Sequence, residues 1–231
     1  MNSMNDEFSR PLANQHARTG SIEVIVGSMF SGKTEELIRL LKRAQLAKQN
    51  VQVFKPKIDN RYSVDQVASH NRNMFHSHVI TQAAEIFQFI RPETHVVGID
   101  EGQFFDQELV DVVNQLAERG LRVVIAGLDM NYKGEPFHPM PELMAIAETV
   151  QKLHAVCVVC GNAASRTQRV VDNESSILVG DDKSYEARCR NCFTLELDHF
   201  NIEHVEVFEE ELIAGDLQAF TINPNSARMD S

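Results

Sequence analysis

Residues 27–34 carry the strongest chemical signal in the sequence, because they read Gly-Ser-Met-Phe-Ser-Gly-Lys-Thr. They match the phosphate-binding pattern G-x-x-x-x-G-K-[ST] and lie between an apolar run at 22–26 and a helical pattern. The glycines let the backbone curl so that successive N–H groups face a β-phosphate, and the helix adds its positive end. Lys33 is expected to reach the β- and γ-phosphates and Thr34 to bind Mg²⁺. The predicted nucleotide-binding residues are therefore Gly27, Ser28, Met29, Phe30, Ser31, Gly32, Lys33 and Thr34.

An acidic pair, Asp100 and Glu101, follows a second apolar run at 95–99. A carboxylate at the carboxyl end of a strand beside a phosphate loop is a common place for Mg²⁺. Adjacent residues on a strand point to opposite faces, so we expect Asp100 and Glu101 to have different tasks, one on the metal and the other on the phosphoryl acceptor. Activation of water would indicate an ATPase or switch, and activation of a bound hydroxyl would indicate a small-molecule kinase. These residues alone leave both readings open.

The four cysteines form two C-x-x-C pairs, Cys157 with Cys160 and Cys189 with Cys192, separated by 28 residues. In a reducing compartment this spacing predicts a closed tetrahedral site for structural Zn²⁺. Redox use of the thiols is one alternative. Replacement of one ligand by His154, three residues before Cys157, is another, although four cysteines already complete the set. The metal would hold together the two ends of the segment between the cysteine pairs, because that segment is long for a loop.

The charge distribution argues against a nucleic-acid partner. The chain has 22 Lys and Arg against 33 Asp and Glu, a formal net charge of -11. Residues 151–198 include six basic and seven acidic residues, so the expected zinc ribbon is poorly suited to binding DNA. A DNA-stimulated ATPase remains the alternative class of protein. The sequence has no run of 18 apolar residues and its first twenty residues are polar. We therefore expect a cytoplasmic protein without a membrane partner.

Apolar periodicity predicts the elements that position these residues. Short β-branched runs typical of buried parallel strands alternate with helical patterns, which indicates an α/β fold of the P-loop NTPase type: a parallel sheet flanked by helices, with a small zinc-ribbon or lasso subdomain. The expected strands are 22–26, 51–54, 95–99 and 122–126, and the expected helices follow the phosphate loop and occupy about 82–90, 106–119 and 142–150. Residues 129–141, with three prolines, are expected to form a structured loop.

The predicted organisation has four parts. A flexible leader occupies 1–20, the P-loop domain 21–152, the zinc-binding lasso subdomain 153–198 and an acidic tail 199–231. The histidines at 70, 76 and 78 are interpreted as loosely spaced surface residues in preference to a second metal site. Arg166 and Arg169 are either phosphate contacts or solvated side chains, and the sequence favours neither.

Four motifs together resemble the cytosolic, zinc-containing type of thymidine kinase. These are the phosphate loop with Met-Phe-Ser inside it, Asp-Glu-Gly-Gln-Phe-Phe at 100–105, Leu-Asp-x-x-Tyr-x-x-x-Pro-Phe at 128–137, and the paired cysteines. The resemblance runs from about Ser21 to about Phe193. Departures are modest: members often have glycine where Asp181 stands and an aliphatic residue where Ser176 stands, and they lack a long acidic tail.

The resemblance implies transfer of a phosphoryl group from Mg²⁺-ATP to the 5′-hydroxyl of thymidine, and of deoxyuridine, in nucleotide salvage. It makes Glu101 the general base, Asp100 the acid on the magnesium side and Arg61 a contact of the reacting phosphates. It also implies a homotetramer and feedback inhibition by dTTP. A lasso loop would read the base with backbone groups near Val179 and Gly180. The remaining pocket walls would be Met29, Phe104, Leu128, Tyr132, Phe137 and Tyr185, although Met29 and Phe104 by themselves read as plain core.

Overall fold

The computed structural model describes residues 20–57, 66–68, 74–171 and 184–195. These residues form a seven-stranded sheet in the order β3-β4-β2-β5-β6-β1-β7, with helices packed on it and two short ribbons beyond its edge. The strands are β1 (Ser21–Gly27), β2 (Val51–Pro56), β3 (Gln66–Ala68), β4 (Met74–Ile80), β5 (Val96–Ile99), β6 (Arg122–Gly127), β7 (Thr149–Leu153), β8 (Ala155–Val156), β9 (Ala163–Ala164), β10 (Arg166–Arg169) and β11 (Tyr185–Arg188). The helices are α1 (Lys33–Leu46), α2 (Ile86–Phe89), α3 (Leu109–Glu118) and α4 (Met140–Ile146), with 3₁₀ turns η1 (Ala83–Glu85) and η2 (Gly102–Phe104).

Six strands of the sheet are parallel, and β3 alone pairs antiparallel, with β4. The register aligns Val26 of β1 with Gly127 of β6, and Ile99 of β5 with Ile125 of β6. The carboxyl ends of β1, β5 and β6 therefore meet at one edge, which is where ligands bind in open parallel sheets.

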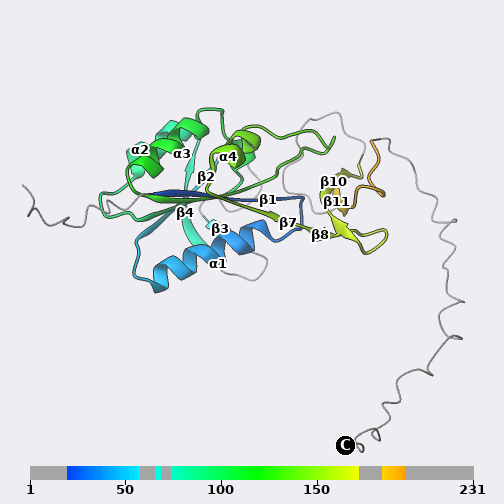
Figure 1. Ribbon diagram of the computed structural model, residues 1–231, viewed down its shortest axis with the longest axis horizontal. Coiled ribbons are helices and arrows are strands. Elements are labelled where there is room, and N and C mark those ends of the chain that lie inside the picture. Colours follow the sequence, from blue (N-terminus) through cyan, green and yellow to red (C-terminus); the bar gives the residue numbers. More distant parts are fainter. Residues whose placement is uncertain (1–19, 58–65, 69–73, 172–183, 196–231) are drawn as a thin grey trace, which may run out of the picture. The chain divides into compact units, whose positions relative to one another are not determined.

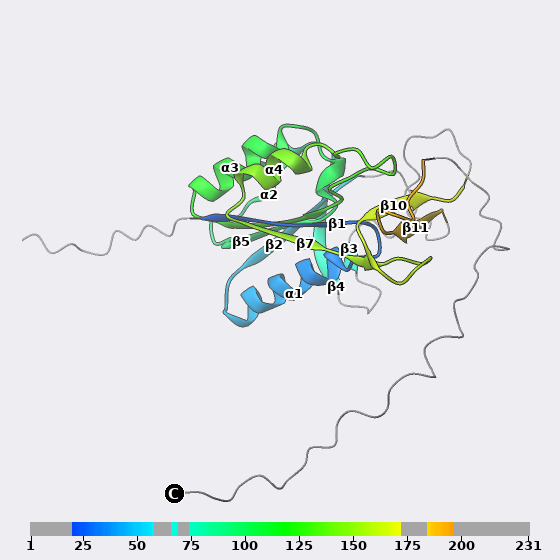
Figure 2. The same ribbon diagram turned by 45° about the vertical axis from the view of Figure 1, so that its right-hand side comes forward.

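Both faces of the sheet are covered, as the apolar character of its central strands requires. Helix α1 covers one face, and α2, α3 and α4 cover the other (Figures 1 and 2). Leu41 of α1 packs so closely on β5 that a Cβ added to Gly98 would lie 2.7 Å from its Cδ1 atom. Glycine at 98 thus lets the helix that follows the phosphate loop pack directly on the strand that precedes the acidic pair.

The cysteines belong to a separate, small packing unit. Strands β8 and β9 form one antiparallel ribbon, and β10 and β11 form another. The apolar cluster of this unit consists of Ala155, Cys157, Ala164, Ala187 and Cys189. Such a core is too small to hold two ribbons together by apolar burial alone, which is the usual circumstance in which a bound metal supplies the missing stability.

The predicted fold class is confirmed, and the four predicted strands are β1, β2, β5 and β6. The helix expected over 142–150 is wrong at its end, because α4 stops at Ile146 and Thr149 begins β7. Strand β7 is an edge strand with four of its five residues exposed, so it lacks the apolar run used to recognise the others. The predicted domain boundaries stay predictions, and residues 1–19 and 196–231 lie outside the described residues.

Of the three histidines interpreted as surface residues, His70 lies outside the described residues, His76 is exposed as expected, and His78 is half-buried. Residues 74–80 form β4, an inner strand, and the ring of His78 stacks on Phe54 at 5.2 Å and packs against Phe89 at 5.0 Å. Burial, and then the charges of His76 and Arg91, lower the pKa of His78, so the neutral ring is favoured there. Polar residues at alternate positions hid this strand from a search for apolar runs. Among the described helices, none has the length and apolar character needed to cross a bilayer.

Candidate functional site

The phosphate loop turns sharply between β1 and α1. Gly27 has a φ of 151°, and a Cβ there would lie 2.5 Å from the backbone oxygen of Leu153, so only glycine fits. Phe30 and Gly32 have φ of 64° and 82°, and α1 begins directly after Gly32. A non-glycine residue with positive φ is strained, and such strain is concentrated at functional sites. The loop therefore presents its backbone N–H groups and the amino end of a 14-residue helix to one place.

Lys33 is held inside this loop. Its Nζ atom donates a hydrogen bond to the backbone oxygen of Ser28 at 2.8 Å. Burial lowers the pKa of Lys33, and the charges of Glu101, Asp100 and then Asp129 oppose that effect. The ammonium group is thus shielded from water, and the charges around it are those of carboxylates. It is a cation that a polyphosphate can bind.

Thr34 and Asp100 meet across the sheet edge. The Thr34 hydroxyl lies 3.3 Å from each carboxylate oxygen of Asp100, which is 8% exposed. The backbone N–H of Glu101 also donates to Asp100, at 3.1 Å. Burial, and then the charge of Glu101, raise the pKa of Asp100 to about 7. A hydroxyl and a carboxylate are oxygen ligands of the kind that Mg²⁺ takes beside a phosphate, so this pair fits the predicted metal.

Glu101 takes a different direction from Asp100, as predicted, but not for the predicted reason. Strand β5 ends at Ile99, so strand alternation does not apply to the acidic pair, and Glu101 has a left-handed φ of 55°. Its Oε2 atom accepts a hydrogen bond from Gln103 Nε2 at 2.6 Å. Gln103 in turn accepts from the backbone N–H of Leu128 at 2.9 Å through Oε1. The buried Gln103, which the sequence analysis did not single out, thus fixes the carboxylate of Glu101 to the strand end of β6.

Four of the predicted pocket walls, which come from separate parts of the chain, make two sets of contacts. Phe104 and Phe137 make an edge-to-face contact with ring centroids 5.7 Å apart. Tyr132 and Tyr185, from the loop after β6 and from β11, both contact the guanidinium of Arg169. Arg61, Val179 and Gly180 lie outside the described residues, so their predicted roles stay predictions.

The phosphate loop also touches the cysteine-containing unit. The backbone N–H of Met29 donates to the hydroxyl of Thr167 on β10 at 3.0 Å. The Ser28 hydroxyl donates to the backbone oxygen of Ala164 on β9 at 3.3 Å. Thr167 is a functional candidate that the sequence analysis missed, because nothing local to it signals a partner 138 residues away. The nucleotide side and the ribbon side of the site are therefore in direct contact.

An ion pair spans the same edge of the sheet. Lys152 Nζ on β7 lies 2.6 Å from Asp129 Oδ2, just beyond β6, while β1 runs between these two strands. The Asp129 side chain is only 7% exposed, and its Oδ1 atom has no hydrogen-bond partner among the described residues. A buried carboxylate with one unpaired oxygen depends strongly on its remaining partner. Lys152 and Asp129 are thus expected to brace the strand that leads into the phosphate loop.

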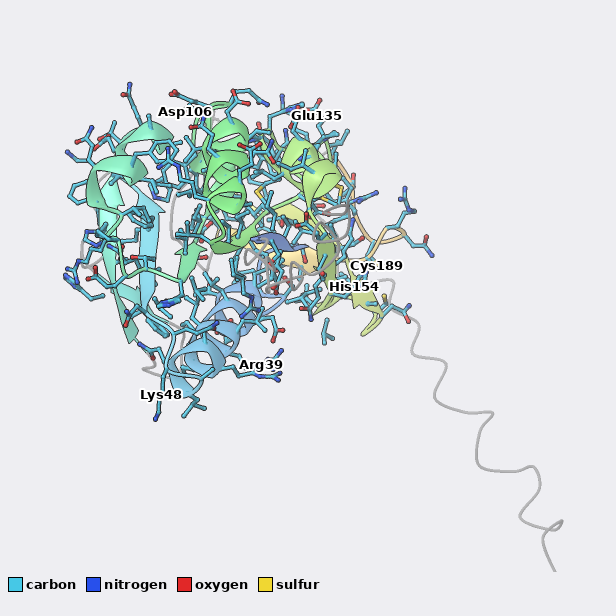
Figure 3. All side chains as sticks on the ribbon, turned by 60° about the vertical axis from the view of Figure 1, so that its left-hand side comes forward. Arg39, Lys48, Asp106, Glu135, His154 and Cys189 are labelled. Carbon is cyan, nitrogen blue, oxygen red and sulfur yellow. The ribbon has the colours of Figure 1, made fainter. Side chains whose placement is uncertain are left out.

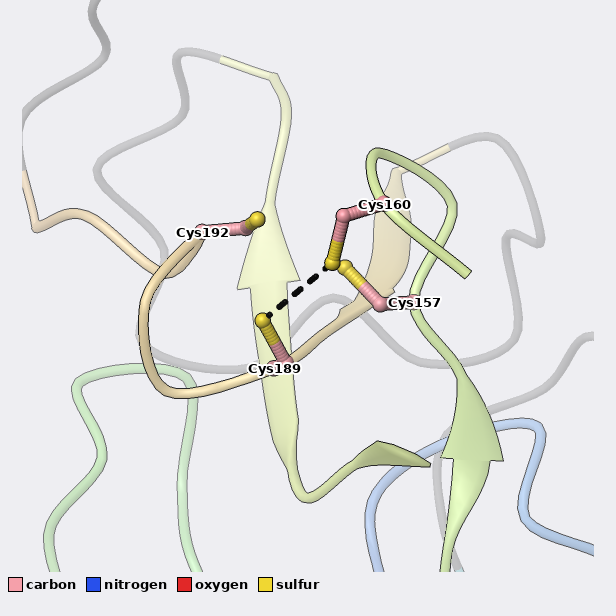
Figure 4. A group of neighbouring side chains, drawn as sticks. All are labelled: Cys157, Cys160, Cys189 and Cys192. Atoms are coloured by element: carbon pink, nitrogen blue, oxygen red, sulfur yellow. Dashed lines mark hydrogen bonds between the residues drawn. The ribbon is translucent and has the colours of Figure 1, made fainter. Parts of the chain in front are cut away.

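The four cysteine sulfurs form a single cluster, with all Sγ atoms within 4.8 Å of one another (Figure 4). A tetrahedral ion with metal–sulfur bonds of about 2.3 Å places its ligands about 3.8 Å apart. The Cys160 and Cys189 sulfurs are 3.6 Å apart, close to that value. Burial alone would raise the pKa of the Cys157 thiol, but backbone hydrogen bonds from Cys189 and Cys160 lower it to about 6. The donor set and its spacing therefore fit a closed structural metal site.

His154, considered as a substitute ligand, is exposed between β7 and β8 (Figure 3). It is not a member of the thiol cluster. Among the described residues, the four cysteines are the single group of three or more potential metal ligands within that spacing. The predicted ligand set of Cys157, Cys160, Cys189 and Cys192 thus comes together, and no histidine is needed to complete it.

Comparison with known proteins agrees with this architecture. A family model described as thymidine kinase matches residues 20–193. A thymidine kinase of Bdellovibrio bacteriovorus is 58% identical over 183 residues, which cover 79% of this chain and 89% of the relative. Thymidine kinases of Bacteroides fragilis and Bacteroides thetaiotaomicron are 55% and 54% identical over 186 residues, covering 80% of this chain and 93% of each relative.

A phosphate loop facing an acidic pair at the edge of a parallel sheet defines a P-loop α/β protein with a cysteine cluster capable of holding a metal. Within that class, the chain belongs to the thymidine kinase family, since the family model and these relatives cover most of its length. It is accordingly an enzyme of the kinase class.

Proposed function

We propose that this enzyme transfers the γ-phosphoryl group of ATP to the 5′-hydroxyl of thymidine, with Glu101 as the general base. The observation that carries the proposal is the contact of Thr34 with Asp100, 66 residues apart, beside Lys33 and Glu101. These groups offer a cation for the phosphates, oxygen ligands for Mg²⁺ and a carboxylate for the acceptor at one sheet edge.

Each residue has a distinct task in the proposed reaction. The N–H groups of the loop and Lys33 hold the β- and γ-phosphates in line with the acceptor. Thr34 and Asp100 would hold Mg²⁺, which would supply positive charge against the transferred group. Glu101 accepts the proton of the 5′-hydroxyl as its oxygen attacks phosphorus and ADP leaves. The hydrogen bond from Gln103 occupies Oε2 of Glu101, which leaves Oε1 for that proton.

Several finer features are proposed on the family resemblance. Thymidine as substrate is supported by the names of the relatives, while phosphorylation of deoxyuridine, inhibition by dTTP, a homotetramer and action in the cytoplasm rest on the resemblance alone. Structural Zn²⁺ is supported by the clustering of four thiols without an open position for substrate. The acidic balance of the chain favours a small-molecule acceptor over a nucleic acid.

The first experiment measures ADP formation from Mg²⁺-ATP with thymidine, with each other nucleoside, with single-stranded DNA and with no acceptor. Turnover that requires thymidine and yields thymidine monophosphate supports the proposal. Hydrolysis that ignores nucleosides but rises with DNA, and falls steeply with salt, would replace it with a DNA-dependent ATPase.

The variant Glu101→Gln tests the general base. We expect kcat to fall by about 100-fold or more while ATP still binds, because the amide cannot accept the proton. Glu118→Gln, an exposed change on α3, is the matched control and should keep wild-type turnover. Substantial thymidine phosphorylation by the Glu101→Gln variant would remove Glu101 from the role of base.

A further inference from the structure

The guanidinium of Arg169 lies against two tyrosine side chains from distant parts of the chain. Its Cζ atom is 3.7 Å from the ring centroid of Tyr132, in the loop after β6. Its Nη2 atom donates a hydrogen bond to the Tyr185 hydroxyl at 3.1 Å, and Cζ lies 5.6 Å from that ring centroid. One side chain thus links the loop that follows the main sheet to the ribbon that carries Tyr185.

The pairing of β10 with β11 fixes this arrangement. Arg169 is the last residue of β10 and stands directly opposite Tyr185 in the antiparallel register. Both side chains are 7% exposed. Directly opposed residues of two strands project to the same side, so the register itself brings the cation to the ring. The planar guanidinium suits this place, because it can stack on the ring of one tyrosine and donate from its edge to the hydroxyl of the other.

We propose that Arg169 is a positioning residue of the nucleoside pocket, which fixes the Tyr132 and Tyr185 side chains in place before the nucleoside binds. This inference rests on the proposed function, because the assignment of both tyrosines to the thymidine pocket belongs to it. Rings that are fixed in advance do not have to be ordered when the nucleoside binds, which lowers the entropic cost of binding.

The hydrogen bond also sets the role of the Tyr185 hydroxyl. Its oxygen accepts from Arg169 Nη2, so the hydroxyl is held in place together with the ring. Thr167, two residues earlier on β10, contacts Met29 of the phosphate loop, whereas Arg169 contacts Tyr132 and Tyr185. The loss of Arg169 should therefore act on the nucleoside and spare ATP.

The test compares Arg169→Met and Arg169→Lys with Arg188→Met as the control. Methionine keeps the bulk and removes the charge, whereas lysine keeps a charge but cannot stack as a flat fork. Arg188 lies on the neighbouring strand and pairs with Glu186, so its replacement perturbs the same ribbon without touching either tyrosine. The readouts are kcat, KM for thymidine and KM for Mg²⁺-ATP.

We expect KM for thymidine to rise about 30-fold in Arg169→Met, the loss of one desolvated cation–aromatic contact, and about fivefold in Arg169→Lys. KM for Mg²⁺-ATP should stay within about twofold in both. Near-ultraviolet circular dichroism gives a second readout, because the chain has no Trp and only three Tyr, two of which contact Arg169. The tyrosine signal should weaken in both Arg169 variants and persist in Arg188→Met.

An unchanged KM for thymidine would overturn the inference, and so would an equal rise of both KM values, which indicates a general structural role. If Arg169→Met fails to fold, Arg169→Lys carries the same test, since it keeps the charge and the aliphatic part of the side chain. A wild-type enzyme without thymidine-dependent turnover would instead refute the proposed function. The two failures are therefore distinguishable in one set of assays.

Discussion

Replacement of Asp100 by asparagine should stabilise the enzyme in the absence of Mg²⁺ and nucleotide. The folded protein raises the pKa of this carboxyl from 3.8 to about 7, through burial and the neighbouring charge of Glu101. The protonated form is therefore favoured by folding, and this contribution is lost as the pH rises from about 4 to about 7. A difference of about three pKa units corresponds to about 4 kcal/mol, which is the penalty an ionised Asp100 imposes above pH 7. Asparagine removes the charge and can still accept the hydrogen bond from the N–H of Glu101.

The assay is thermal unfolding of the wild type and Asp100→Asn between about pH 4 and about pH 8, at one protein concentration and without metal or nucleotide. The two proteins should be similar near pH 4 and diverge with rising pH, until the variant melts roughly 8 to 16 °C higher. Asp106→Asn, an exposed carboxylate, is the control and should show little divergence. Mg²⁺ with ATP should narrow the gap, because a cation beside the carboxylate favours its ionised form. A melting difference that does not change with pH would refute the reasoning.

Three further predictions concern the surroundings of the site. Lys152→Met should lower the free energy of unfolding, measured in urea, by about 1–3 kcal/mol, because Asp129 stays buried without its partner. The double variant with Asp129→Asn should regain part of that lost free energy. Thr167→Val should weaken ATP binding, measured by calorimetry without nucleoside, about fivefold by loss of the hydrogen bond to Met29, while Thr167→Ser keeps wild-type affinity. The purified enzyme should hold about one zinc per chain by elemental analysis, and Cys160→Ser should lose both the metal and the ribbon; a stable, active, zinc-free variant would contradict the structural role.

The residues expected to contact the phosphates and the metal were predictable because short sequence motifs identify them. Lys33 and Thr34 stand at fixed positions in the phosphate loop, and Asp100 and Glu101 follow an apolar strand directly. Parallel strands end at one edge, so two local signals far apart in the sequence can be placed together without a structure. The left-handed turn at Glu101 was not predictable, because no feature of a lone Glu signals a positive φ.

The residues that link the parts of the site were hidden for a different reason. Thr167 and Arg169 acquire their partners only through the register of β10 with β11 and the contact of that ribbon with Met29. Such contacts depend on tertiary structure, so neither composition nor periodicity marks them. His78 illustrates the converse, since a polar residue in a polar segment becomes an inner-strand residue stacked on Phe54.

The contact between Met29 and Thr167 has a consequence for synthesis of the protein. The phosphate loop is made early, but the hydroxyl that holds it is added 138 residues later. At a translation rate of about 5–20 residues per second, this delay is about 7–28 s. During that interval the nascent sheet carries a loop without its partner, and any nucleotide it met would bind an incomplete site. Ribosome-bound chains that end before β10 and chains in which β11 has left the ribosome should thus differ in their affinity for ATP, so that competence to bind the nucleotide arises late in translation.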